Sequence, residues 1–310
     1  NNYKLLNVHS DSKMISIFGD AELDEGNIYE ALLEGAKQNL QNCWWIIDYN
    51  RQSLDGIIHN KAFEKIIRLF SLMGWNVEIL KYGKKLGDLK DSPGGKDILN
   101  WIDDCPNDLF SALTYKGGKE WRITLNEAFK NNAIVKNIIN SKSDDDLHLL
   151  MTNLAGHDLL ALDEAFSKHQ NDRTPTCFIC YTVKGFGLPL AGHKDNHSGI
   201  MNLEQFNAYQ NQMAVRKNKE WEKLEGINIT AETYENILLN NSLANQKRIL
   251  NDKKLKITLT QKAIFKNKLS TQEAFGNILH SLGKEKDNNV GRIITTSPDV
   301  TVSTNLGAWV

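Results

Sequence analysis

The stretches ISIFGDAELDEGN (residues 15–27) and WWIIDYNRQSLDG (residues 44–56) each begin with an apolar run and then change abruptly to acids, amides and glycine. An apolar run of this length that is bounded by polar residues and glycine predicts a buried strand. The polar residues then come where each strand ends. Asp20 follows the first run, and Asn50 follows the second run thirty positions later.

Alternation of strand-like and helix-like patterns continues along most of the chain. Apolar residues at helical spacing predict helices between the apolar runs. We expect strands at 13–18, 44–49, 76–82 and 176–183, and helices at 26–40, 61–73, 94–102, 118–130 and 159–170. Apolar strands separated by helices are typical of an α/β fold with a doubly wound parallel sheet.

The later part of the chain has a different pattern. Residues 203–252 are helical and very polar without strand-like runs, and a helix–strand unit opens again at 269. We therefore expect a first domain over 1–202, a helical connector over 203–268, and the truncated start of a second α/β domain over 269–310. Because about forty residues are too few to bury a domain core, we expect this sequence to be a fragment, with material missing on both sides.

Composition excludes several classes of protein. The chain has 310 residues, of which 41% are hydrophobic and 24% are charged. This composition is typical of a globular protein with one or two hydrophobic cores. A net charge of −1 offers no basic surface for nucleic acid. No apolar run approaches the ~20 residues of a membrane span, and the N-terminus lacks a secretory signal pattern. Four cysteines in so long a chain fit a reducing compartment, so we expect a cytoplasmic protein.

The polar residues at the two strand ends suggest a site for a metal and an anion. In open α/β sheets, ligands bind at the carboxyl ends of the strands. Gly19 allows backbone to approach a phosphate, and the carboxylate of Asp20 with the amides of Asn50 and Gln52 is a hard-oxygen set for Mg²⁺ or Ca²⁺. The same residues also suit an Asp helix cap and an Asn-rich turn, and spacing alone does not separate the two interpretations.

Longer blocks carry a family resemblance. They run in order along nearly the whole chain: GDAELDEGNIYEAL, NRQSLDG, GWNVEILKYG, GHDLLALDEAF, TVKGFGLPLAGHKDNHSGIM and TTSPDVTVSTNLGAWV. Together they resemble the decarboxylase component of homodimeric, pyruvate-type 2-oxoacid dehydrogenases, in the transketolase-like thiamine diphosphate superfamily. The resemblance implies a diphosphate-binding domain over 1–202 and the start of a pyrimidine-binding domain at 269–310.

The same resemblance implies which residues form the site. It makes Asp20, Asn50 and Gln52 the magnesium ligands. Further positions that would contact thiamine diphosphate are Gly19, Ala21, Glu22, Asp48, Leu54 and Lys184. Of these, Asp48 stands where the family's pyruvate enzyme has Asn, Ala21 replaces the commoner Gly, and Leu54 matches an apolar contact.

Two histidines are implied to act near the reacting groups. His197 matches a loop histidine that assists acyl transfer to a lipoyl group. His157 belongs to an AGHD block that recurs in the superfamily and is a candidate for the rim of the site. Asp158 in that block is also well placed to cap the helix that follows. Asp299 resembles a residue of the second domain that faces the cofactor of the other subunit.

The function implied is Mg²⁺- and thiamine diphosphate-dependent oxidative decarboxylation of a 2-oxoacid, pyruvate or 2-oxobutyrate. The implied partners are a second copy in a homodimer and the lipoyl-bearing acyltransferase component. The activating glutamate would lie beyond Val310, so we expect the fragment alone to be inactive. Transketolase activity and a non-catalytic protein that keeps the thiamine fold remain alternatives. A nicotinamide-binding dehydrogenase is disfavoured because no Gly-x-Gly-x-x-Gly follows a strand.

Several other patterns have structural interpretations. Cys177 and Cys180 share a metal-like spacing, but within a strand they point to opposite faces, which predicts core residues. Trp44 and Trp45 continue an apolar strand and predict packing. The run KSDDDL at 142–147 predicts a charged turn before a helix. A metal site from His193, Asp195 and His197 lacks a fourth ligand nearby and is disfavoured.

Overall fold

The computed structural model describes residues 13–51, 62–197, 199–241, 268–284, 290, 293–296 and 304–309. The chain divides into two compact units, Asn1–Ile227 and Asn228–Val310. The second unit contains the helices α12 (Ala231–Asn240) and α13 (Thr271–Gly283). No helix of the described residues is long and apolar enough to cross a membrane.

The first unit alternates strands and helices in its N-terminal part and is helical in its middle. In chain order it contains β1 (Met14–Gly19), the 3₁₀ helix η1 (Asp20–Asp24), α2 (Gly26–Lys37), β2 (Cys43–Tyr49), α3 (Ala62–Leu72), β3 (Asn76–Leu80), α4 (Lys84–Gly87), η2 (Asp88–Asp91), α5 (Gly95–Asp104), α6 (Asn107–Lys116), α7 (Gly118–Ala128), α8 (Ala133–Asn140), α9 (Asp144–Met151), η3 (Ala155–His157), α10 (Leu159–His169), β4 (Thr176–Tyr181) and α11 (Leu203–Gln212).

The four strands form one parallel sheet in the order β1-β2-β4-β3. Each strand is reached through at least one helix, which is the connection that parallel neighbours require. The predicted α/β parallel fold is confirmed. All four predicted strands are present, with ends that differ by one or two residues from the expected ones.

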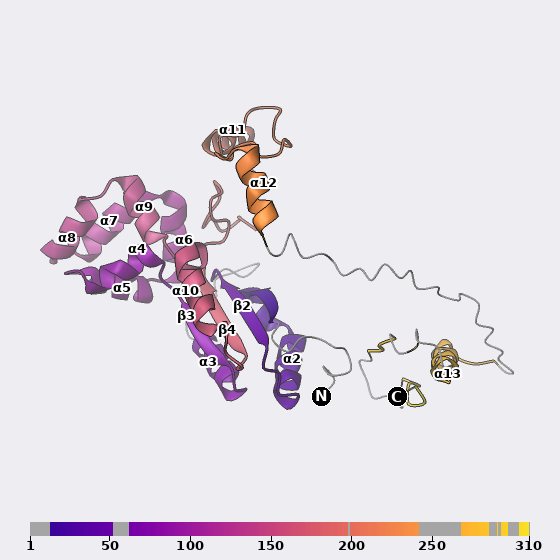
Figure 1. The fold of residues 1–310 in the computed structure, drawn as a ribbon. Coiled ribbons are helices and arrows are strands. Elements are labelled where there is room, and N and C mark those ends of the chain that lie inside the picture. The colour runs from indigo at the N-terminus through magenta and orange to yellow at the C-terminus, as the bar shows by residue number, and fades with distance from the viewer. Residues whose placement is uncertain are drawn as a thin grey trace. The chain divides into compact units, whose positions relative to one another are not determined.

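Opposite faces of the sheet bury different side chains. On one face, Trp45 and Cys177 pack with the helices α2 and α3 around Leu32 and Phe70. On the other face, Trp44, Phe178 and Cys180 pack against α10. Because helices cover both faces, the sheet is doubly wound, and Figure 1 shows α10 lying along the strands. The predicted packing roles of both tryptophans and of Cys177 and Cys180 are confirmed.

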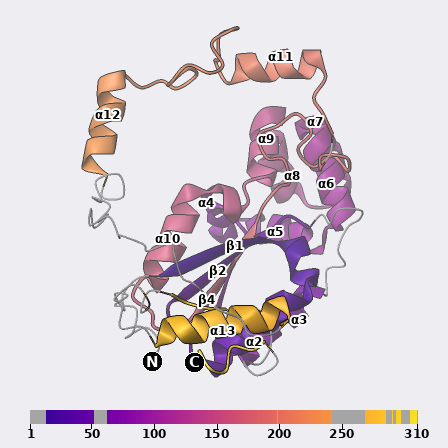
Figure 2. The same cartoon turned by 90° about the vertical axis from the view of Figure 1, so that its right-hand side faces the viewer.

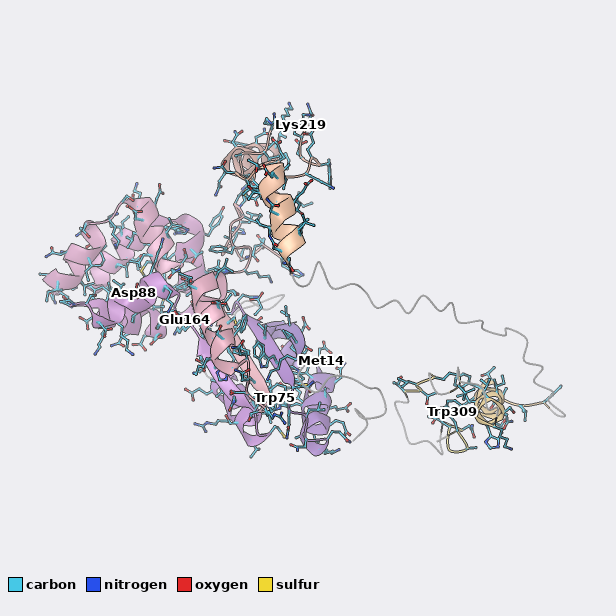
Figure 3. All side chains as sticks on the ribbon, viewed as in Figure 1. Met14, Trp75, Asp88, Glu164, Lys219 and Trp309 are labelled. Atoms are coloured by element: carbon cyan, nitrogen blue, oxygen red, sulfur yellow. The ribbon has the colours of Figure 1, made fainter. Side chains whose placement is uncertain are left out.

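Side chains near the rims of the sheet differ in exposure, and Figure 3 labels two of them. Trp75, just before β3, is buried against Trp45 with ring centroids 5.0 Å apart. Met14 at the start of the edge strand β1 is 65% exposed. The core is therefore centred on β2 and β4, the two strands with neighbours on both sides.

A helical layer lies beyond one end of the sheet, as the two views in Figures 1 and 2 show for α5 to α9. Its own core contains the fully buried Trp121 with Phe110, Leu125, Ile139 and Met151. A single bridge between Tyr82 and Leu154 connects the loop after β3 to the segment after α9. This layer covers the edge of the sheet where the strands end.

Two helices of this layer were not predicted: α6 and α8. The run at 142–147 was expected as a charged turn before a helix, but only Lys142 and Ser143 precede α9, and the rest of the run is already helical. Ser143 caps α9, its hydroxyl accepts the N–H of Asp146, and the three aspartates form the first helical turn. Acids are favourable there because they meet the positive end of the helix dipole.

Asp158 caps α10 as predicted. Its Oδ1 accepts the N–H groups of Leu160 and Ala161, and its Oδ2 accepts the N–H of Lys84 at 2.8 Å. Burial would raise the pKa of this carboxyl, but the hydrogen bonds from Lys84, Asn153 and the helix hold that pKa below its ordinary value. The cap therefore also joins the start of α10 to the start of α4.

Predictions for the later part of the chain are tested only in places. The polar helices expected after 203 are present as α11 and α12, and the helix near 270 is α13. Of the strand expected over 290–300, the structure describes 290 and 293–296, which form no strand. The rest of that segment, including Asp299, lies outside the described residues. The domain boundaries at 202 and 268 stay predictions.

Candidate functional site

Three strand ends converge at the edge of the sheet that faces the helical layer. Gly19 at the end of β1 is in register with Asp48 near the end of β2. The N–H of Thr182, just after β4, donates to the carbonyl oxygen of Tyr49 at 3.1 Å. The residues that follow β1, β2 and β4 are therefore neighbours, as expected for the carboxyl edge of a parallel sheet.

Asp20 is the buried acid of this edge, with 5% of its surface exposed. Its Oδ2 accepts the backbone N–H of Arg51 at 2.8 Å, so the ends of β1 and β2 are joined through this carboxylate. Burial raises the pKa of Asp20, the N–H groups of Arg51 and Ala21 lower it, and the charge of Asp48 raises it further. Within the described residues Asp20 forms no ion pair.

The residues around Asp20 form a tight local turn. The N–H of Gly19 donates to Oε1 of Glu22 at 3.2 Å, so the glutamate folds back over the start of η1. Ala21 is half-buried and Glu22 is exposed. An acidic side chain at this position favours the helix start because of the free N–H groups there.

His157 lies beside Asp48. The hydroxyl of Thr182 donates to Oδ1 of Asp48, and Nε2 of His157 accepts the N–H of Val183 at 2.8 Å. The imidazole also stacks on Phe186, with ring centroids 3.8 Å apart. Burial lowers the pKa of His157, and the charge of Asp48 raises it. With Nε2 accepting, the neutral ring carries its proton on Nδ1.

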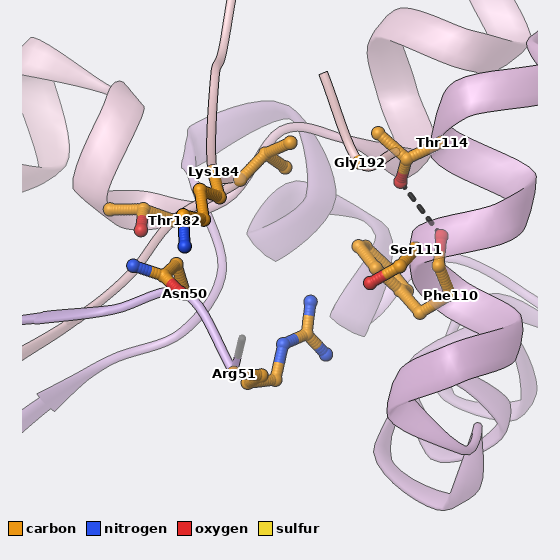
Figure 4. Close-up of a pocket in the computed structure, with 9 residues that line it drawn as sticks. Asn50, Arg51, Phe110, Ser111, Thr114, Thr182, Lys184 and Gly192 are labelled. Atoms are coloured by element: carbon orange, nitrogen blue, oxygen red, sulfur yellow. Dashed lines mark hydrogen bonds between the residues drawn. The ribbon is translucent and has the colours of Figure 1, made fainter. Parts of the chain in front are cut away.

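Asn50 and Lys184 line one pocket, together with Arg51, Phe110 and Thr182. Figure 4 shows this pocket between the ends of β2 and β4 and the helix α6. The pocket is small: the space open to a water molecule is about 10 Å³, enough for roughly one water. Two of the predicted cofactor residues, from strand ends 134 positions apart in the sequence, thus meet at one cavity.

The loop that follows Lys184 is folded onto itself. The Lys184 carbonyl oxygen accepts the N–H of Gly192 at 3.2 Å and Nδ2 of Asn196 at 3.0 Å. His193 contacts the ring of Tyr115 on α6, and its Nδ1 accepts the N–H of Asp195. His197 is exposed and is not among the residues that line the pocket.

The structure thus gives the position of some predicted site residues and not of others. Asp20, Asn50 and Lys184 lie at the converging strand ends, with Asp48 and His157 next to them, while His197 does not line the pocket. Gln52 and Leu54 fall outside the described residues. No group of three or more His, Cys, Asp or Glu that could hold a metal occurs in the described ranges, which gives no support to a site at His193, Asp195 and His197.

Comparison with known proteins gives a consistent result. No family model matches the chain. The chain is 30% identical over 193 residues to the pyruvate dehydrogenase E1 component of Cupriavidus necator, covering 60% of this chain and 20% of that protein. It is 27% identical over 302 residues to the protein of the same name from Haemophilus influenzae, covering 92% and 33%. For Escherichia coli K12 the identity is 24% over 192 residues, covering 60% and 21%.

The chain is thus similar to the pyruvate dehydrogenase E1 components of several bacteria. It spans about a fifth to a third of the length of the E1 components it matches. The resemblance predicted from the sequence blocks is confirmed.

Sequence reasoning missed one side of the pocket. Arg51 was passed over between two amides that matched a motif, and Phe110, Ser111 and Thr114 lie on α6, which was not predicted. The sequence did contain a signal for Arg51. This residue is a cation, and it lies within a segment that already held the predicted residues of an anion site. No pattern in the sequence pointed to α6 as its neighbour.

Proposed function

We propose that this chain supplies the Mg²⁺–diphosphate-binding part of a thiamine diphosphate-dependent 2-oxoacid dehydrogenase. Its substrate would be pyruvate or 2-oxobutyrate, and the acyl group would pass to a lipoyl group of the acyltransferase component. The observation that carries the proposal is the position of Asp20 and Asn50 at adjoining strand ends in a chain related to E1 components. A cytoplasmic homodimer is part of the same proposal.

The described residues fit a divalent cation. Asp20 is a buried carboxylate with a second acid, Asp48, close enough to raise its pKa, so a positive charge here would relieve both burial and repulsion. Asn50 offers a carboxamide from the next strand end, and Gln52 follows two positions later. One carboxylate and two amide oxygens, completed by phosphate oxygens, are the ligands that Mg²⁺ prefers.

The remaining residues would hold the diphosphate and the reactants. Gly19, Ala21 and Glu22 would border the diphosphate, Lys184 would offset its charge from the end of β4, and Leu54 would make an apolar contact. Thiamine diphosphate, when bound, supplies the nucleophilic carbon and the electron sink that decarboxylation needs. The chain's contribution is to bind, orient and neutralise charge.

Two histidines would move or hold protons. His157 is neutral at physiological pH because burial lowers its pKa, and its free Nδ1–H can donate to a neighbouring oxygen. Asp48 is held by the hydroxyl of Thr182 next to this ring. His197 would assist acyl transfer from the exposed loop, a position from which it can reach a lipoyl group brought by another protein.

The proposal is tested by enzyme assay of the full-length protein. With Mg²⁺ and thiamine diphosphate, we expect release of CO₂ from pyruvate or 2-oxobutyrate, and acyl transfer when a lipoyl domain is added. Activity should disappear when Mg²⁺ is removed by a chelator. Ketol transfer between sugar phosphates, in place of decarboxylation, would favour transketolase. Thiamine diphosphate binding without either reaction would leave only a non-catalytic role.

A further inference from the structure

A buried histidine at the end of α10 lies between two carboxylates. His169 is 7% exposed. Its Nδ1 lies 2.8 Å from Oδ2 of Asp172, and its Nε2 lies 3.2 Å from Oε2 of Glu78 on β3. Ionised carboxylates accept hydrogen bonds and donate none, so the ring must supply the proton in each contact. A neutral imidazole has one N–H and can satisfy one of the two contacts, whereas the imidazolium form satisfies both.

Further donors hold the two acidic residues in place. Nζ of Lys168 lies 2.8 Å from the same oxygen of Glu78. Nδ2 of Asn76 donates to Oδ2 of Asp172 at 3.3 Å, and Lys13 donates to the carbonyl oxygen of Asp172. Burial raises the pKa of Glu78, but the hydrogen bonds from Lys168 and His169 hold that pKa below its ordinary value. Glu78 is therefore ionised at neutral pH and remains an acceptor.

These contacts join an edge strand to the rest of the sheet. β3 is the last strand in the order β1-β2-β4-β3, and Glu78 is in register with Phe178 on the face that α10 covers. From β4, the ring of Phe178 packs against His169 with ring centroids 5.5 Å apart. His169 ends α10, and Asp172 lies in the segment that leads to β4. The histidine thus connects β3 to the link between α10 and β4.

We propose that His169 is a pH-sensitive clasp that holds the edge strand β3 against α10. With both ring nitrogens protonated, the ring bonds Glu78 and Asp172 at once and its charge offsets theirs. When one proton is lost, a bare nitrogen faces a carboxylate oxygen and one of the two hydrogen bonds disappears. Histidine in an unfolded chain gains its second proton below pH ~6.5, so the clasp is complete in the acidic range and is lost as the pH rises. The inference goes beyond the proposed function and requires none of its chemistry.

Nuclear magnetic resonance can observe the protonation of His169 directly. In uniformly ¹⁵N-labelled protein, with His169→Gln used to assign the signals, we expect both ring nitrogens to have the chemical shift of an N–H at pH 6.0. At pH 8.5 one of them should have the shift of an unprotonated nitrogen, and the backbone amide signals of β3 should move with it. A neutral ring at pH 6.0, or the same protonation at both pH values, would overturn the proposal.

Urea unfolding of His169→Gln at the same two pH values tests the effect on the fold. Glutamine can keep one of the two hydrogen bonds but carries no charge. Because hydrogen bonds to charged groups are the stronger ones, we expect the substitution to lower the folding equilibrium constant about tenfold more at pH 6.0 than at pH 8.5.

Lys168→Met is the matched control for the clasp. It removes the other cation that contacts Glu78, and the charge of a lysine does not change between pH 6.0 and pH 8.5. Its effect on the folding equilibrium constant should therefore be the same at both pH values. An equal effect of His169→Gln at the two pH values, or the same pH dependence for Lys168→Met, would contradict a clasp at His169.

Discussion

The Asp20→Asn variant is expected to lose Mg²⁺-dependent binding of thiamine diphosphate by more than about 100-fold. Removal of a side chain that only supports a metal's ligands lowers the affinity for the metal about 10- to 100-fold. A larger loss is expected for Asp20 because it would be a ligand itself. The asparagine keeps an oxygen that can accept the N–H of Arg51, so the turn at the end of β2 should persist. Isothermal titration calorimetry with and without Mg²⁺ measures the loss.

Asp24→Asn is the matched control for this change. Asp24 is the last residue of the same short helix, is exposed, and carries the same charge. Its substitution should leave the affinity for thiamine diphosphate within about twofold of the wild-type value. If Asp20→Asn and the wild type bind thiamine diphosphate with equal affinity, Asp20 is not a ligand of the metal.

The Asp20→Asn variant should be at least as stable as the wild type when no ligand is present. Because burial raises the pKa of Asp20, the folded state favours the protonated acid. Protonation of Asp20 therefore stabilises the folded state. This stabilisation is complete below pH ~4, the pKa of an aspartate in the unfolded chain, and it is lost as the pH rises through the higher pKa of Asp20 in the folded protein. At neutral pH the wild type therefore holds an unfavourable buried charge that asparagine removes. Opposite effects on stability and on binding are characteristic of a functional residue.

The second large effect is expected for Trp121→Ala, which should lower the stability of the first unit by about 3–5 kcal/mol. Trp121 on α7 is fully buried, and its ring contacts Phe110 and Trp101 at centroid distances of 5.3 and 6.1 Å. Removal leaves a cavity that the surrounding helices can fill only in part. Urea unfolding followed by circular dichroism measures the change.

Two further variants make this result specific. Ile123→Ala, on the same helix but 54% exposed, should change stability by less than about 0.5 kcal/mol. The indole N–H of Trp121 has no partner among the described residues. Trp121→Phe therefore removes an unpaired donor while keeping most of the ring, and should cost much less than the alanine variant. A loss below about 1 kcal/mol for Trp121→Ala would contradict the buried position of this helix.

The strands of the sheet were predictable because their apolar runs are short, bounded and rich in aromatic and β-branched residues. Trp44 and Trp45 illustrate this: neighbours in sequence, they fill the cores on opposite faces. The convergence of Asp20 and Asn50 was predictable for a related reason, since parallel strands end at one edge. Both predictions depended only on local pattern and on general sheet geometry.

The contribution of α6 was not predictable in the same way. The segment around Phe110 and Ser111 has a weak amphipathic pattern, and the packing of α7 behind it decides where it lies. The burial of Arg51 results from the rings of Phe110 and Tyr181, which are distant from it in sequence. Tertiary contacts of this kind leave no local signal.

The most direct measurement of the central claim is anomalous X-ray scattering from crystals grown with thiamine diphosphate and Mn²⁺ in place of Mg²⁺. We predict a single strong peak about 2 Å from an oxygen of Asp20 and from the carboxamide oxygen of Asn50, with the diphosphate completing the coordination. A bound diphosphate with no peak at these two residues, or a peak at other residues, would contradict the account.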